Sequence, residues 1–244
     1  MAIRTSTLKL PTHTTQDDTL TGPGRNDDDV PGVARIIAEP DERVDGLTIR
    51  QWAENYLTAA FATPDGPSNP LHDPTGSAAV AFNSGGGKMY FITEAPKGLT
   101  RDFNVAHGQD VLLPIAFAED TEGPGIFPSI PGFNGSPAAE VRRVMATSHF
   151  DNVTLTVDGK PVNDLEETRT GIFSAGEVQA GSVAQDFFGA ATGTSLGTTA
   201  LEGYFVVFKG LSAGTHTIVS TSSFSSQFIG NSAVGSHTDI IHVT

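Results

Sequence analysis

Residues 204–222 read YFVVFKGLSAGTHTIVSTS, and this stretch decides the fold class. The apolar run at 204–208 is typical of a buried strand, and the β-branched residues at 215–222 indicate a second one. A turn at Ala213 and Gly214 separates the two runs. The stretch therefore predicts two consecutive strands of a β protein.

Other short apolar or alternating runs extend this pattern over most of the chain. They predict strands at 78–82, 88–93, 100–106, 110–118, 143–148, 152–157 and 239–243. The 27 glycines and 15 prolines are spread among these runs, as many tight turns require. We expect an all-β fold, an antiparallel β-sandwich or jelly roll with one short N-terminal helix.

The predicted helix covers residues 47–63. Thr48 is placed to cap it and Gln51 to complete a capping box, and Trp52 and Tyr56 belong to an apolar face at helical spacing. Pro64 ends the pattern. We expect a buried Trp52 that anchors the helix on a sheet rather than a ring that binds a ligand.

The chain divides into an extended N-terminal arm, residues 1–46, and a single β-sandwich domain, residues 47–244. Residues 2–10 alternate loosely and predict an edge strand that pairs with its own domain or with a neighbouring copy. Residues 33–37 predict a further short strand. The stretches 119–139 and 171–199 have no clear periodicity, so we expect loops that carry binding surfaces or partner contacts.

The charge balance excludes some partners. With 14 Lys and Arg against 28 Asp and Glu, the formal charge is -14, which disfavours nucleic acid as a partner.

The chain has no cysteine, so disulfides and thiolate chemistry are excluded. We expect no membrane span. The first eight residues lack the apolar core of a secretory signal, which leaves a cytoplasmic protein, a trimmed signal, or export without N-terminal cleavage.

Several motifs together resemble a group of largely uncharacterised bacterial secreted β-sandwich proteins. They are QW at 51–52, NPLHDPTG at 69–76, MYFI at 89–92, VLLPI at 111–115, VTLTVDGKPV at 153–162 and GYFVVFKGLSAGTHTI at 203–218. The resemblance covers roughly residues 47–220 and implies a β-sandwich and an extracellular or cell-surface location. The group's cysteines and extra tryptophans are missing here, and it implies no activity.

Motifs for catalysis are absent from the sequence. There is no Gly-x-Ser-x-Gly elbow, so a hydrolase site would need unmarked carboxylates or a Ser/His pair. Residues 85–88 read GGGK but precede a strand, which predicts a hairpin turn rather than a phosphate loop. His237 and His242 differ by an odd number and should lie on opposite faces of a strand. We assign no catalytic residue.

Carboxylates are the abundant candidate ligands, and two groups of them could hold calcium. One comprises Asp27, Asp28 and Asp29, in a stretch like the Gly- and Asp-rich calcium repeats of exported bacterial proteins. The other comprises Glu119, Asp120 and Glu122, which follow the most apolar predicted strand. Solvated acidic loops, or paired glycosidase acids in the second group, are the alternatives.

Three function classes remain open. The first is a non-enzymatic extracellular or cell-surface unit that self-assembles through its N-terminal arm, with calcium as a supporting ion. The second is a binding module for carbohydrate or another surface ligand, although one Trp and three Tyr offer few aromatic platforms. The third is a hydrolase with an unmarked site.

Overall fold

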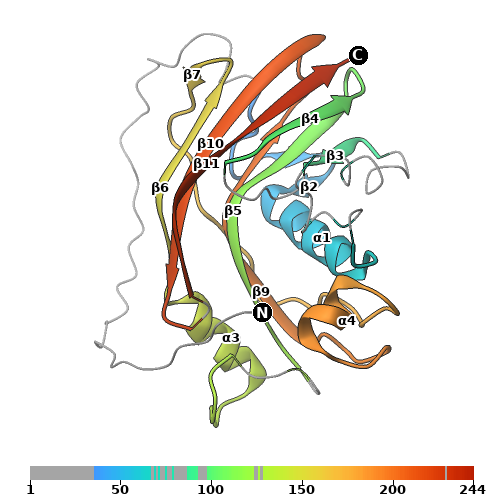
Figure 1. The fold of residues 1–244 in the computed structure, drawn as a ribbon, viewed down its shortest axis with the longest axis vertical. Helices are drawn as coiled ribbons and strands as arrows, with labels where there is room; N and C mark the ends of the chain where they lie inside the picture. The colour runs from blue at the N-terminus through green and yellow to red at the C-terminus, as the bar shows by residue number, and fades with distance from the viewer. Residues whose placement is uncertain are drawn as a thin grey trace.

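The computed structural model describes residues 36–66, 69, 71, 75, 79, 87–92, 98–123, 126, 129–228 and 230–244. Two facing β-sheets and a helix packed on the outer face of one of them form three layers (Figure 1). The predicted all-β sandwich is therefore confirmed.

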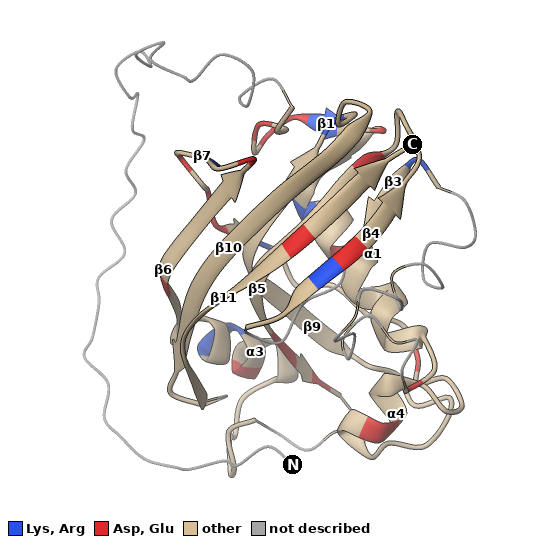
Figure 2. Cartoon of the chain, turned by 45° about the horizontal axis from the view of Figure 1, so that its top comes forward, with Lys and Arg blue, Asp and Glu red and all other residues tan. Residues whose placement is uncertain are grey.

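The first sheet has five strands in the order β4-β11-β10-β6-β7. Its strands are β4 (Thr100–Val105), β6 (Ser148–Val157), β7 (Lys160–Pro161), β10 (Gly214–Ser226) and β11 (Gly230–Val243). Neighbouring strands are antiparallel except β4 and β11, which are parallel. Figure 2 shows an acidic position on β11 beside a basic and an acidic position on β4; these are Asp239, Arg101 and Asp102.

The second sheet has four strands in the order β3-β5-β9-β8. Its strands are β3 (Met89–Phe91), β5 (Asp110–Glu122), β8 (Thr168–Arg169) and β9 (Thr198–Phe208). The long pair β5 and β9 is antiparallel, and its register shifts between Pro114 and Ala116. Pro114 lies beside this bulge, a position in a sheet where a residue without a backbone N–H is tolerated. The bulge reverses the side-chain alternation along the rest of β5.

Apolar side chains of both sheets meet in the core between them. The five-stranded sheet contributes Phe103, Leu155, Ile218 and Ile241, and the four-stranded sheet contributes Val111, Leu113, Ile115, Val206 and Phe208. The opposite face of the four-stranded sheet packs on a helix, with Leu112, Leu201, Phe205 and Val207 against Ala53, Tyr56, Leu57 and Phe61. The four-stranded sheet is thus the central layer and is buried on both faces.

Helix α1 (Ile49–Ala62) is the predicted N-terminal helix. Its capping box is present: Gln51 N–H donates to Thr48 Oγ1 at 3.3 Å, and Thr48 N–H donates to Gln51 Oε1 at 3.1 Å. Trp52 donates from Nε1 to the Val44 carbonyl at 2.9 Å and meets the Phe91 ring edge-on. Trp52 is half-buried rather than fully buried, but it anchors the helix as expected.

The strand predicted at 143–148 is wrong. Residues 137–145 form helix α3 (Pro137–Met145), and β6 begins only at Ser148. Ser136 caps α3 by accepting from the Ala139 N–H, and Pro137 is well suited to its first turn. Val141 and Val144 are buried at helical spacing. A further short helix, α4 (Val183–Phe188), lies in the stretch expected to be loop.

The chain before α1 contacts the sandwich as far back as the structure describes it. Ile37 forms a bridge with Phe208, and Ala38 is buried in the core beneath α1. Residues 36–46, assigned by sequence to the arm, therefore pack on the domain. The predicted strands at 2–10 and 78–82 lie outside the described residues, apart from Ala79. No helix in the described part of the chain is long and apolar enough to cross a membrane.

Candidate functional site

A cleft of about 930 Å³ opens where three distant parts of the chain meet. Residues 37–54 form one side, residues 161–171 form another, and Phe205 and Val206 of β9 contribute the third. This volume is in the range of small-molecule sites.

A tight hairpin sets one wall of the cleft. Strands β1 (Arg43–Val44) and β2 (Leu47–Thr48) pair around a two-residue turn, Asp45 and Gly46, both with positive φ. An Asp-Gly pair is well suited to such a turn. Thr48 then caps α1, so the hairpin and the first turn of the helix are fixed relative to each other.

Nine charged side chains line the cleft, beside about as many apolar ones. The carboxylates are Glu39, Asp41, Glu54, Asp164, Glu166 and Glu167, and the guanidinium groups are Arg43, Arg50 and Arg169. Burial raises the pKa of Glu54, and the nearby charge of Arg50 only partly opposes this. The cleft carries an excess of negative charge at neutral pH, because the carboxylates outnumber the guanidinium groups.

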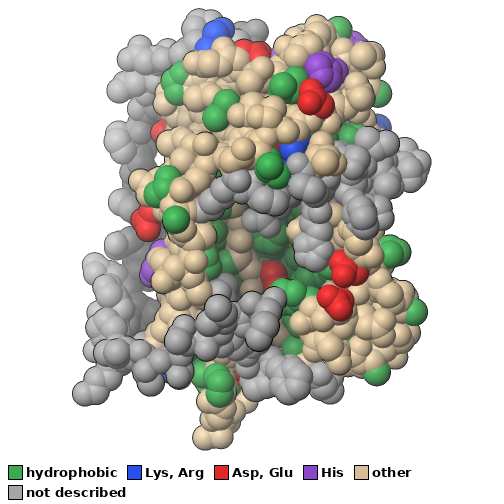
Figure 3. Space-filling model, in the orientation of Figure 1, with side chains coloured by type: hydrophobic (Ala, Val, Ile, Leu, Met, Phe, Trp, Pro, Cys, Tyr) green, Lys and Arg blue, Asp and Glu red, His purple; other side chains and the backbone are tan. Residues whose placement is uncertain are grey.

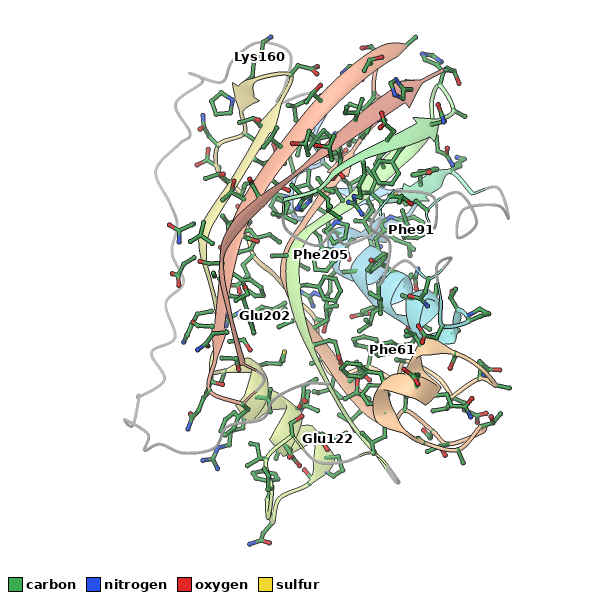
Figure 4. The ribbon with its side chains drawn as sticks, viewed as in Figure 1. Phe61, Phe91, Glu122, Lys160, Glu202 and Phe205 are labelled. Atoms are coloured by element: carbon green, nitrogen blue, oxygen red, sulfur yellow. The ribbon has the colours of Figure 1, made fainter. Side chains whose placement is uncertain are left out.

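One edge of the cleft continues into a buried carboxyl group. Arg169 lies opposite Glu202 in the β8–β9 register and contacts its Oε1 at 2.7 Å, and it also reaches Glu167 Oε2 at 3.3 Å. Burial, then the hydrogen bond with Glu167, raises the pKa of Glu202 to about 8. Burial thus favours the protonated form of Glu202, and the charge of Arg169 opposes it. Figure 4 shows it on β9 between Phe205 and the end of β5 that carries Glu122.

The structure divides the predicted calcium group Glu119, Asp120 and Glu122 between the two faces of the central sheet. Ala118 packs against α3, so by alternation Asp120 and Glu122 share its face and Glu119 lies on the other. Ser129 Oγ donates to Asp120 Oδ1 at 2.5 Å, and Ser129 N–H donates to Glu122 Oε1 at 2.7 Å. These two carboxylates therefore hold the chain that follows β5.

Burial also changes the protonation of this group. Burial, then the charge of Asp120, raises the pKa of Glu119 to about 8. Burial raises the pKa of Glu122 to about 7 in spite of the hydrogen bond from the Ser129 backbone. Glu140 of α3, which sequence reasoning missed, is buried nearby and accepts from the Ile130 N–H at 2.6 Å. A glutamate in the first turn after a Ser-Pro cap was the available signal.

Among the described residues, no three His, Asp or Glu side chains form a group that could hold a metal ion. The second predicted calcium group, Asp27, Asp28 and Asp29, lies outside the described residues. Calcium binding at either group stays a prediction.

A serine, a histidine and an aspartate do come together, but inside the sandwich. Ser220 Oγ lies 2.8 Å from His237 Nε2, and Asp239 Oδ2 lies 3.5 Å from the same nitrogen. Asp239 pairs with Arg101 at 2.8 Å, and both side chains are fully buried. Burial, then the charge of Arg101, lowers the pKa of His237 to about 4. The arrangement is a neutral histidine in a polar network buried on the inner face of the five-stranded sheet.

Two further histidines join neighbouring strands at the surface. His216 Nδ1 lies 2.9 Å from Asp158 Oδ2, so it bonds to the turn after β6. His242 contacts Asp102 at 3.1 Å and Thr215 at 3.1 Å. His237 is buried and His242 is not, which confirms that they occupy opposite faces of β11.

Figure 3 shows that the face with β4, β11 and α1 is hollowed near its centre, with hydrophobic side chains around the hollow. The cleft beside β9 is lined by described residues of three segments and is the candidate site.

Comparison with known proteins gives no family. No family model matches the chain, and no curated protein matches it. Among solved structures, the solution structure of amebosin is similar over 65% of this chain and 100% of its own, at 13% identity and a TM-score of 0.22. That similarity is too low to assign fold or function.

Proposed function

We propose that this protein is a non-enzymatic binding module whose cleft beside β9 takes a small polar ligand. The observation that carries the proposal is the cleft itself, with a volume of about 930 Å³ and a lining in which charged side chains of residues 37–54 and 161–171 converge beside Phe205 and Val206. A sandwich whose four-stranded sheet is covered by helix α1 supplies a rigid support for such a site.

The position of the Ser/His/Asp network favours binding over hydrolysis. Ser220, His237 and Asp239 do not line the cleft, and each is buried within the five-stranded sheet. The carboxylates of the cleft can accept hydrogen bonds from hydroxyl, amide or ammonium groups. An extracellular or cell-surface location, as expected from the sequence, would suit this role.

A thermal-shift screen tests the proposal. The panel comprises neutral monosaccharides, N-acetylated amino sugars, amino acids and blocked tripeptides. At least one member should raise the melting temperature of the wild-type chain, because a ligand that binds only the folded state stabilises it. The same member should leave the Gly171→Trp variant unchanged, since Gly171 lines the cleft and a Cβ added there would meet no atom within 4 Å.

Ala180→Trp is the matched control, because Ala180 is exposed and lies outside the cleft. It should respond to the ligand as the wild type does. If no panel member stabilises the wild type more than Gly171→Trp, the cleft is not a binding site for these classes.

Self-association is the second candidate. The five-stranded sheet ends at β4, and no other described strand pairs with the outer edge of these six residues. An open edge of this kind can accept a strand from another copy. Deletion of residues 2–10 should then convert oligomers into monomers with an unchanged β circular-dichroism spectrum. A full-length chain that is monomeric by light scattering rejects this candidate.

Calcium support is tested separately. If the carboxylates Glu119, Asp120 and Glu122, or Asp27, Asp28 and Asp29, bind calcium, millimolar calcium should raise the melting temperature and a chelator should reverse the rise. Equal melting curves would retire this prediction.

A further inference from the structure

The outer edge of β9 is paired above and below the cleft. Thr170 N–H donates to the Leu201 carbonyl at 2.9 Å, and β8 continues this pairing with Thr168 opposite Gly203. Further along, Ala38 N–H donates to the Val207 carbonyl at 2.9 Å. In an antiparallel ladder alternate residues direct their N–H and C=O to the same side. The odd-numbered residues of β9 therefore face away from β5.

Phe205 is the odd-numbered residue between these two paired segments. Its main-chain N–H and C=O face the outer edge, and no described residue forms a hydrogen bond with them. Phe205 and Val206 also line the cleft, together with Ala38 and Thr168. The gap in the edge of the sheet thus opens into the cleft. From Gly203 to Val207 a strand advances about 13 Å, which accommodates about three residues of an extended chain.

The charges around the gap favour a cation. Asp41, Asp164 and Glu166 are exposed in the cleft, and no described residue forms an ion pair or a hydrogen bond with their side chains. Arg169 is held by Glu167 and Glu202 and Arg43 donates to the Gly46 carbonyl, so the guanidinium groups of the cleft, with Arg50, offset only part of this charge. The unpaired carboxylates leave a negative potential that a basic side chain would complement.

We propose that the cleft binds an extended peptide with basic side chains, whose main chain pairs with the N–H and C=O of Phe205. This inference rests on the binding function proposed above and names its ligand class. It is strand addition at a one-residue gap, in which main-chain hydrogen bonds provide affinity and the carboxylates provide selectivity. A carbohydrate would need neither the strand geometry nor the excess of negative charge.

The test uses the full chain and three blocked peptides. The probe is acetyl-Lys-Val-Lys-amide, and its controls are acetyl-Glu-Val-Glu-amide and the fully N-methylated Lys-Val-Lys peptide. The Lys peptide should bind and should slow hydrogen exchange at the Phe205 amide. Charge reversal or N-methylation should each weaken binding about tenfold or more, because the first replaces attraction with repulsion and the second removes the main-chain donors.

Protein variants measure how much the carboxylates of the cleft contribute to the affinity for the Lys peptide. The double variant with Asp164→Asn and Glu166→Gln should bind the Lys peptide about tenfold more weakly than the wild type does. Asn tolerates the positive φ of Asp164, so the backbone should be retained. Glu177→Gln, at an exposed position outside the cleft, is the matched control and should bind as the wild type does.

The outcomes distinguish this inference from the proposed function. Equal affinity for the N-methylated peptide, or an unchanged Phe205 exchange rate in the complex, overturns strand addition. If a monosaccharide binds in a manner blocked by Gly171→Trp while the Lys peptide does not bind, the binding module stands and the peptide class is rejected. If neither ligand binds, both proposals fail.

Discussion

At the residue scale, buried carboxyl groups couple the stability of this chain to pH. The pKa values of Glu119 and Glu202 are raised to about 8 and that of Glu122 to about 7, chiefly by burial. The folded state therefore holds protons that the unfolded chain releases near its ordinary carboxyl pKa. The stabilisation is complete below that pKa and is lost as pH rises through the folded values.

His237 acts in the opposite direction. Its folded pKa is lowered to about 4, so its contribution is complete above the ordinary histidine pKa and is lost as pH falls toward the folded value. Three raised carboxyl groups outweigh one histidine. We expect maximal stability near about pH 5 and a decline toward about pH 8.5.

Glu119→Gln tests this coupling, because the amide imitates the protonated acid. One pKa unit is worth about 1.4 kcal/mol. When the pH is raised from about 5 to 8.5, the free energy of unfolding of the variant should therefore rise by on the order of 3 kcal/mol relative to that of the wild type. Urea denaturation at the two pH values measures this. Parallel pH profiles for Glu119→Gln and wild type would refute the assignment.

The ion pair between Arg101 and Asp239 gives a second residue-scale prediction. Both side chains are fully buried, with Arg101 Nε also donating to Asp239 Oδ1 at 2.9 Å. Arg101→Met should lower the free energy of unfolding by about 3–5 kcal/mol, because it leaves a buried carboxylate without its cation. Adding Asp239→Leu should recover much of that loss. A double variant as unstable as Arg101→Met would show that the charge itself is not the cause.

At the element scale, the bulge in β5 depends on a glycine in β9. A Cβ at Gly203 would overlap the Ala116 carbonyl oxygen and the Phe117 Cα. Gly203→Ala should therefore destabilise the fold by about 3 kcal/mol through backbone overlap. Gly171→Ala is the control, since a Cβ at Gly171 would meet no atom within 4 Å, and it should stay within about 0.5 kcal/mol of wild type. Chemical denaturation compares the two, and equal stabilities would contradict the close approach.

The sequence pattern predicted elements well where local signals were strong. The capping box of Thr48 and Gln51 located the start of α1, and the apolar run at 204–208 located part of β9. At 143–148 the apolar residues were interpreted as a strand, because the signal for α3 lies earlier, at Ser136 and Pro137. The predicted strands were also too short. Strands β10 and β11 continue through polar residues, which are extended because the two strands pair with each other there.

At the scale of the whole molecule, the candidate site could not be predicted from local sequence. Its lining comes from residues 37–54, 161–171 and 205–206, which tertiary packing alone brings together. Of the predicted calcium residues, Glu119, Asp120 and Glu122 are described, and none of these three lines it. The acidic residues at 164–167 formed the only local signal, and a charged run is more often a solvated surface. The open edge at Phe205 depends on where β8 and the Ile37–Phe208 bridge stop, which side-chain patterns do not specify.

The most direct test of the binding function is a two-dimensional NMR titration of the full chain with the panel member that raises the melting temperature most. We expect the largest amide shifts at Thr168, Gly171, Phe205 and Val206, which line the cleft, and we expect Gly171→Trp to abolish them. Shifts confined to β4 and β11, with the cleft amides unmoved, would contradict the account and place binding on the opposite side of the sandwich.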